Sequence, residues 1–153
     1  MSNTYTQLHV QLVFAVKYRE ALIHPSWEVK LHQYITGIIR NQGHQMLAIN
    51  GMPDYLHILL GWRPNQSISD LMKMIKTGST NWINEEQLVR TRFQWQGGYG
   101  AFSYSKKHVP NVKRYIENQK EHHRSWLFLD EYKTLLKEAE LEYDERYLFH
   151  LPL

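Results

Sequence analysis

Hydrophobic and polar side chains alternate over residues 7–16. Successive side chains of a strand point to opposite faces, so this alternation predicts a strand with one covered and one open face. The apolar positions are Leu8, Val10, Leu12, Phe14 and Val16, and the polar positions between them are Gln7, His9 and Gln11.

Two later segments have the period of a helix rather than a strand. Apolar residues recur every three or four positions over residues 27–39, and again over residues 68–83 after Ser67, a residue type that favours helix N-caps. Between these helices, residues 46–50 and 55–61 are short and apolar and are separated by a turn. They predict a pair of strands joined as a hairpin.

The C-terminal third adds an aromatic segment and two more amphipathic segments. Residues 93–105 are prone to form a strand but contain three glycines, which predicts a bent or bulged strand. Residues 111–123 and 129–139 predict two further helices. In order, this is the βαββαβ arrangement of a ferredoxin-like α+β domain plus extra C-terminal helices, and we expect residues 1–153 to form one domain.

In a ferredoxin-like fold the two crossover helices cover one face of an antiparallel sheet. The strand at residues 55–61 therefore presents one set of side chains to the helices and the other to the open face. We expect Leu56, Ile58 and Leu60 to face the helices, and Tyr55, His57 and Leu59 to lie on the open face.

Composition narrows the possible partners and locations. A net charge of +3 with 13% aromatic residues is compatible with nucleic acid, because aromatic rings stack on unpaired bases. The chain has no cysteine, which excludes disulfides, thiolate metal sites and a cysteine nucleophile. No apolar run approaches the ~20 residues of a membrane span, and the first residues have no signal-peptide pattern. We expect a cytoplasmic protein with no membrane contact.

Tyr55 and His57 are two residues apart and point to the same face of the predicted strand. A neutral imidazole is an ordinary ligand of divalent metals, whereas a protonated phenol is a poor one. On spacing alone, a packing or hydrogen-bonding role for His57 is favoured over metal binding.

Tyr115 and Gln119 are four residues apart and share one face of the predicted helix at residues 111–123. A tyrosine can act as a nucleophile, and a glutamine supplies a neutral oxygen to a hard cation. Spacing alone favours the alternative, in which Tyr115 belongs to an apolar stripe with Val112 and Ile116.

Four segments in this order resemble the single-tyrosine HUH transposases of small bacterial insertion sequences, which move as single-stranded DNA. They are "MPDYLHILL", "SISDLMKMIKTGSTNWIN", "FQWQGGYGAFSYS" and "VKRYIENQKEHH". The resemblance runs from the first strand to about residue 123.

The resemblance implies a site in which two histidines and a glutamine bind Mg²⁺ or Mn²⁺ while a tyrosine attacks DNA. Carried over, His57 is the second histidine, Gln119 the third ligand and Tyr115 the nucleophile that forms a 5′-phosphotyrosine. The first histidine position is occupied by Tyr55. Asp54 and His9 are the neighbouring candidates for a replacement ligand, although strand alternation turns the former away.

The resemblance also implies a homodimer in which the tyrosine helix of one subunit serves the metal site of the other. The glycines at 97, 98 and 100 would then be a flexible link before that helix, or alternatively a simple β-bulge. It further implies recognition of hairpins formed by single-stranded transposon ends. Basic residues near aromatic ones are the candidate DNA contacts: Lys17, Arg19, Lys73, Lys76, Lys113 and Arg114.

Two other hypotheses compete with an active DNA transposase. A catalytically impaired or domesticated relative would bind hairpin DNA without cutting it, because Tyr55 replaces a metal ligand. A ferredoxin-like small-molecule or regulatory domain with no DNA role is supported only by the modest net charge.

Overall fold

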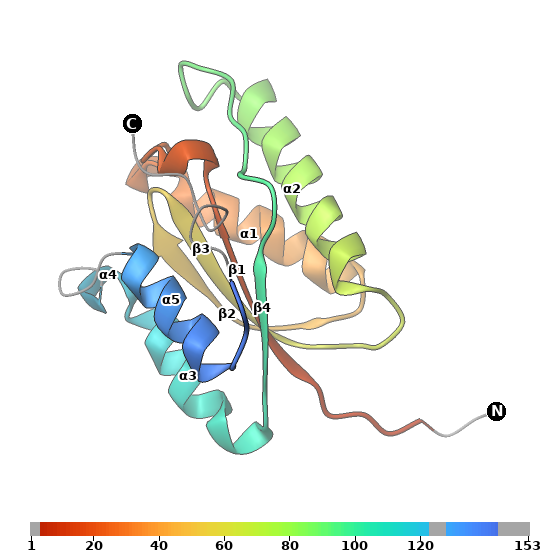
Figure 1. Cartoon of the computed structure of the whole chain (residues 1–153). Helices are drawn as coiled ribbons and strands as arrows, with labels where there is room; N and C mark the ends of the chain where they lie inside the picture. The colour runs from red at the N-terminus through yellow and green to blue at the C-terminus, as the bar shows by residue number, and fades with distance from the viewer. Residues whose placement is uncertain (1–3, 123–127, 144–153) are drawn as a thin grey trace.

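The computed structural model describes residues 4–122 and 128–143, which form a four-stranded antiparallel sheet with helices on both sides (Figure 1). The strands lie in the order β2-β3-β1-β4, so the first strand is central and the chain crosses over twice. This order confirms the ferredoxin-like α+β fold. The elements are β1 (His9–Ala15), α1 (Pro25–Asn41), β2 (Gln45–Met52), β3 (Tyr55–Gly61), α2 (Ile68–Glu85), β4 (Gly100–Tyr104), α3 (Val109–Glu117), α4 (Gln119–His122) and α5 (Phe128–Glu138).

The main hydrophobic core lies between the sheet and the crossover helices α1 and α2, which are behind the sheet in Figure 1. Local sequence sets where each helix begins. The Ser67 hydroxyl accepts a hydrogen bond from the backbone N–H of Asp70, so the predicted N-cap of α2 is confirmed. The helix α1 begins with Pro25 in its first turn, where the missing N–H removes no helical hydrogen bond.

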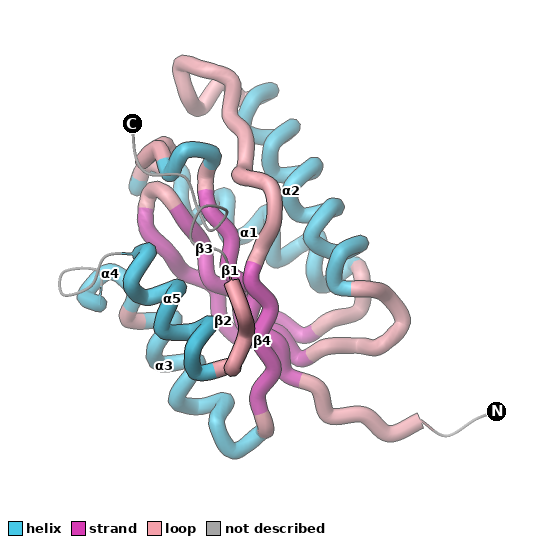
Figure 2. The backbone as a smooth tube through the Cα atoms, in the orientation of Figure 1, coloured by secondary structure: helices cyan, strands magenta, loops and turns pink. Residues whose placement is uncertain are grey.

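The second face of the sheet is covered as well, by α3, α4 and α5 (Figure 2). The prediction that Tyr55, His57 and Leu59 lie on an open face is therefore wrong, since all three are fully buried. The cause is the apolar side of the C-terminal helices: Ile116 packs against Leu59, while residues of α5 pack against Tyr55. The C-terminal helices thus convert an exposed strand face into an enclosed one.

The strand expected over residues 93–105 is shorter than predicted. Only Gly100–Tyr104 pairs with β1, and the segment before it makes a single bridge, between Trp95 and Val16. A side chain on Gly100 would place its Cβ 2.8 Å from the Tyr132 hydroxyl, so this glycine permits close packing of α5 on the sheet.

Gly97 and Gly98 precede β4 and Gly100 is its first residue, so the rest of β4 and a short 3₁₀ turn lie between these glycines and α3. The flexible link before the tyrosine helix stays a prediction. The single helix expected over residues 111–123 is also divided, into α3 and α4 at Asn118. Among the described helices, none is long and apolar enough to cross a membrane.

The hairpin between β2 and β3 depends on Gly51, where a Cβ would lie 2.1 Å from the backbone oxygen of Tyr55. We expect Gly51→Ala to lower the free energy of unfolding by about 2–3 kcal/mol, because the neighbouring backbone must move. Gly37→Ala is the matched control, since Gly37 is exposed on α1 with nothing within 4 Å of the added atom. That change should stabilise the protein by about 0.5–1 kcal/mol through helix propensity. Urea unfolding of both variants measures the contrast, and equal effects would contradict it.

Candidate functional site

A cluster of buried and partly buried polar side chains lies between the second face of the sheet and the C-terminal helices. Its members are Tyr55 and His57 of β3, Tyr115 of α3, Gln119 of α4 and Glu131 of α5. A strand and three consecutive C-terminal helices therefore supply one cluster. The structure brings together the four residues singled out from the sequence and adds Glu131 to them.

Glu131 is the centre of the cluster, because three side chains approach its Oε1 atom. The Nε2 atom of His57 lies 3.0 Å away, at ion-pair distance. The Tyr115 hydroxyl donates a hydrogen bond to the same oxygen, and the Gln119 Nε2 atom donates another at 3.4 Å. The carboxylate is fully buried, so these contacts replace the water that it would otherwise bind.

The opposite side of the His57 ring is also held in place. Its Nδ1 atom lies 2.9 Å from the Gln11 amide nitrogen, and the Gln11 amide oxygen accepts a hydrogen bond of 2.8 Å from the Tyr104 hydroxyl. Such contacts to the second ring nitrogen fix the orientation of a histidine and decide which nitrogen carries the proton.

Tyr55 closes the cluster on its inner side. Its hydroxyl donates a hydrogen bond of 3.2 Å to the Gln119 Oε1 atom, and its ring meets that of His57 edge to face. The tyrosine therefore contacts the two residues that the sequence predicts as metal ligands.

The environment keeps the two tyrosines protonated and Glu131 deprotonated. Burial, followed by the charge of Glu131, raises the pKa of Tyr115 and of Tyr55 far above the ordinary value of a phenol. Burial also acts to raise the pKa of Glu131, but its contacts with His57, Tyr115 and Gln119 outweigh burial and lower that pKa. At neutral pH the cluster therefore contains two phenols and one buried carboxylate, a charge that requires a cationic neighbour.

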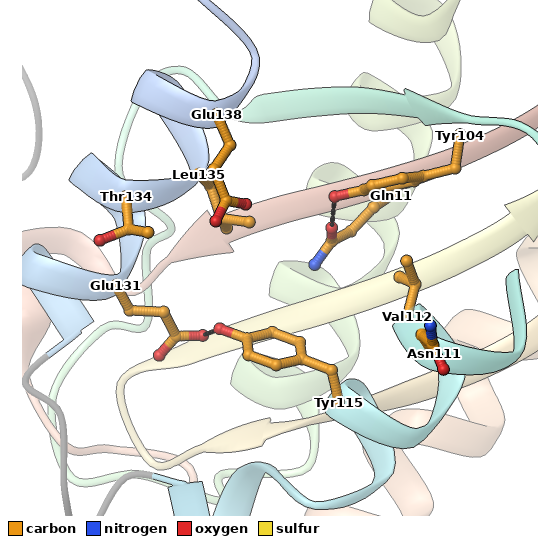
Figure 3. A pocket seen from close by; sticks show the side chains of 9 residues that line it. All are labelled: Gln11, Tyr104, Asn111, Val112, Tyr115, Glu131, Thr134, Leu135 and Glu138. Atoms are coloured by element: carbon orange, nitrogen blue, oxygen red, sulfur yellow. Dashed lines mark hydrogen bonds between the residues drawn. The ribbon is translucent and has the colours of Figure 1, made fainter. Parts of the chain in front are cut away.

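A cavity of about 280 Å³ opens beside the cluster, between α3 and α5 (Figure 3). Tyr115 and Glu131 meet along one side of it, and Tyr104 and Gln11 lie opposite them. Because Tyr115 is only partly buried, its ring connects the enclosed cluster to this opening. The remaining lining residues are Asn111, Val112, Thr134, Leu135 and Glu138.

The two neighbouring candidates for a replacement ligand lie elsewhere. Asp54 forms an ion pair with Arg19 at 3.6 Å. His9 is paired with Gly61 at one end of β1, four residues from the position that pairs with His57. In the described part of the chain, no group of three or more His, Cys, Asp or Glu side chains is arranged to hold a metal ion. A cation site here therefore has to combine different donor types.

Sequence reasoning missed Glu131. A weak signal was available, because this carboxylate is four residues before Leu135 and so interrupts the apolar stripe of the last helix. Nothing in the sequence placed that helix against β3.

The six basic residues predicted to contact DNA fall into two groups. Lys73, Lys113 and Arg114 are exposed. Of these three, Arg114 donates to the Asn111 side chain on its own helix. The other group is held by other parts of the fold: the Lys17 ammonium donates to the Gln94 side chain, Arg19 is buried beside Asp54, and Lys76 donates to the backbone oxygens of Gln96 and Gly98. Burial lowers the pKa of Lys76 to about 8.

The fold is that of a tyrosine transposase. It matches the structure of the REP-associated tyrosine transposase bound to a REP hairpin with a TM-score of 0.61 and 15% identity, over 83% of this chain and 74% of that one. It also matches a crystal structure of a proposed transposase from Deinococcus radiodurans with a TM-score of 0.63 and 26% identity, over 78% of this chain and 95% of that one.

The chain belongs to the IS200-like transposase family, whose model matches residues 4–119. A curated relative, the ISDra2 transposase TnpA of Deinococcus radiodurans, is 27% identical over 118 residues, which are 74% of this chain and 84% of the relative. The resemblance identified from the sequence is therefore confirmed. Transposases of this family generally use a divalent metal ion.

Variants of Arg19 and Lys73 should show whether a basic residue stabilises the fold or contacts DNA. We expect Arg19→Met to lower the free energy of unfolding by about 1–3 kcal/mol, because it leaves the largely buried carboxylate of Asp54 without its ion pair. Lys73→Met should leave stability unchanged and reduce the slope of log affinity against log salt by about 1. Urea unfolding and fluorescence anisotropy with a hairpin oligonucleotide test both variants. A smaller salt slope in folded Arg19→Met would contradict the division.

Proposed function

We propose that this transposase binds hairpin-forming single-stranded transposon ends and cleaves and rejoins DNA through a 5′-phosphotyrosine on Tyr115. The observation that carries this proposal is the convergence of Tyr115, His57 and Gln119 on Glu131, in a cluster from which Tyr115 and Glu131 border an open cavity. The ring centroids of Tyr115 and His57 are 5.8 Å apart within the same chain. A nucleophile and the predicted ligands of the metal are therefore neighbours.

The chemical step exchanges one phosphate ester for another. The Tyr115 oxygen attacks phosphorus and forms a new P–O bond, while the bond from phosphorus to the 3′ oxygen of the preceding nucleotide breaks. The phenol loses its proton to the Glu131 oxygen that already accepts its hydrogen bond. The departing 3′ oxygen takes up a proton from water and becomes a hydroxyl, and Glu131 releases the tyrosine proton to water. A 3′-hydroxyl from another strand can reverse the step, so strand transfer needs no ATP.

The residues present fit a divalent metal ion. His57 offers an imidazole nitrogen that has no hydrogen-bond partner among the described residues, and Gln119 offers an amide oxygen. We propose that these two side chains hold Mg²⁺ or Mn²⁺. When bound, such an ion polarises the scissile phosphate and stabilises the charge that develops on its oxygens.

We propose a homodimer as the working form and hairpin DNA as the partner. Support for DNA comes from the exposed cations Lys113 and Arg114 on α3, the helix that also carries Tyr115. A strand held by these cations would lie near the nucleophile. The REP-associated tyrosine transposase, which is bound to a REP hairpin, has the same fold.

Tyr55 supports a second function, in which the protein binds hairpin DNA without cutting it. Its hydroxyl contacts Gln119 from the position where the resemblance places a ligand histidine, and its raised pKa keeps it a neutral phenol. A neutral phenol is a poor ligand for Mg²⁺. The two functions differ in whether a covalent adduct forms.

Tyr115→Phe should abolish a covalent protein–DNA adduct while leaving hairpin binding intact, because it removes only the nucleophilic oxygen. Purified protein is incubated with Mn²⁺ and single-stranded hairpin oligonucleotides and analysed on a denaturing gel. Tyr34→Phe on α1, behind the opposite face of the sheet, is the matched control and should form the adduct as the wild type does. Salt-sensitive binding with no adduct from the wild type would support the second function, and an adduct from Tyr115→Phe would contradict the first.

Tyr55→His should raise the rate of adduct formation by about tenfold or more, since it restores a nitrogen ligand beside His57. The rate is measured at fixed DNA while Mn²⁺ is varied. If the new histidine binds the metal, the variant reaches its half-maximal rate at a lower Mn²⁺ concentration than the wild type. An unchanged concentration would show that Tyr55 does not limit metal binding.

A further inference from the structure

We propose that Glu131 is a direct ligand of the divalent metal ion and supplies the third protein donor that Tyr55 does not. This inference rests on the proposed function, because it concerns the same metal. It assigns a role to a residue of α5, an element beyond the segment matched by the family model.

The burial of Glu131 is the first observation. Its side chain is 1% exposed, and its Oε2 atom is buried with no hydrogen-bond partner among the described residues. A buried carboxylate oxygen without a donor is costly, and the usual remedies are a paired cation or a coordinated metal. His57 is the adjacent basic group, and its Nε2 atom is also buried and lacks a hydrogen bond in the described structure. The imidazole therefore faces the carboxylate at 3.0 Å through Nε2 and Oε1, while the second carboxylate oxygen, Oε2, has no donor among the described residues.

The spacing of the candidate donor atoms is the second observation. Mg²⁺ holds its ligands at about 2.0–2.1 Å in octahedral geometry, so adjacent ligand atoms are about 3 Å apart. The His57 Nε2 atom and the Glu131 Oε1 atom are 3.0 Å apart, and the Gln119 amide nitrogen is 3.4 Å from that oxygen. The first separation is that of neighbouring ligands around one ion, and the second places the Gln119 amide within a few tenths of an ångström of it.

Gln119 can supply its oxygen with little rearrangement. A half-turn of the side-chain amide exchanges the positions of its oxygen and nitrogen, which directs the oxygen toward Glu131 and the nitrogen toward Tyr55. The Tyr55 hydroxyl then accepts a hydrogen bond instead of donating one, since a hydroxyl does both. Tyr55 would thus hold the glutamine ligand without binding the ion itself.

The pair of Gln11 and Tyr104 allows His57 to present the nitrogen that a metal requires. Binding through Nε2 needs a free electron pair there, so the proton must be on Nδ1 and must be donated outward. The Gln11 amide lies 2.9 Å from Nδ1, and turning the amide over offers its oxygen as the acceptor. The Tyr104 hydroxyl can accept from the amide nitrogen in that arrangement.

Packing fixes the position of the carboxylate. Tyr132 and Leu136, which follow Glu131 on α5, are buried against Val13 and Tyr55 of the sheet. Gly100 admits the Tyr132 ring at a distance that any larger residue would prevent. A donor on a rigidly packed helix loses little freedom when it binds an ion.

A carboxylate can serve the metal and the nucleophile together. It has about four lone-pair positions on two oxygens, so it can accept the Tyr115 hydrogen bond and still bind a cation. The alternative is a charged pair of protonated His57 and Glu131 with no metal site. The two cases differ in Mn²⁺ affinity, which is measured without DNA and without catalysis.

The test measures Mn²⁺ binding to the full chain by the electron paramagnetic resonance signal of free Mn²⁺. We expect Glu131→Gln to weaken binding at least about tenfold, while Asp130→Asn, a change at the exposed carboxylate next to it on α5, leaves binding unchanged. Tyr115→Phe should also bind Mn²⁺ as the wild type does, although it forms no adduct. The assay therefore separates a wrong ligand assignment from a wrong nucleophile.

A second variant guards against a loss of folding in Glu131→Gln. Tyr55→His combined with Glu131→Gln should recover Mn²⁺ affinity, because a nitrogen ligand then replaces the lost oxygen. Circular dichroism compares the folding of all variants. If a Gln variant does not fold, Glu131→Asp replaces it, because the shorter side chain keeps the carboxylate but moves it away from the site. Equal Mn²⁺ affinity in wild type and Glu131→Gln would overturn the proposal. So would a wild type that binds no Mn²⁺.

Discussion

The structure around the cluster depends on one constraint, which is that the buried carboxylate of Glu131 must be matched by donors or by a cation. Its Oε1 atom is contacted by His57, Tyr115 and Gln119, which come from three different elements. Removing a carboxylate from water without such partners costs several kcal/mol. The position of α5 therefore also determines where the tyrosine hydroxyl lies and which way the imidazole faces. The packing of α5 and the geometry of the site are therefore determined together.

Covering the second face of the sheet gives this transposase an enclosed site. In the described part of the chain, β3 is buried on both sides, with the hydrophobic core of α1 and α2 behind it and the C-terminal helices in front. Enclosure strengthens each electrostatic contact, because the local dielectric is lower than in water. It also limits access to the side on which Tyr115 borders the cavity. In the proposed function, a DNA strand would therefore approach along α3, the helix that carries Tyr115.

Periodicity predicted the sheet and its crossover helices because strands and helices bury their apolar residues at different, readable intervals. It did not predict that α3 to α5 fold back over His57. The apolar side of an amphipathic helix shows that the helix packs against another surface, but not which surface. The resemblance indicated Tyr115, Gln119 and His57, and the structure brings these together. Neither periodicity nor the resemblance indicated Glu131. It follows the segment that carries the resemblance, and its partners are set by tertiary packing. The burial of Arg19 beside Asp54 could not be predicted for the same reason, because it depends on a turn with two residues of positive φ, Tyr18 and Arg19.

Charge gives Tyr55 and Glu131 a common explanation. A site with two histidines and a glutamine has neutral donors, whereas His57, Gln119 and Glu131 carry one negative charge together. A carboxylate attracts a divalent cation more strongly than an imidazole does, which offsets the loss of a nitrogen ligand. The same charge repels the phosphate of an incoming strand as long as no cation neutralises it. Such a site would therefore join metal binding to DNA binding more tightly than one built from neutral ligands, because the strand can enter only after the charge of Glu131 is balanced.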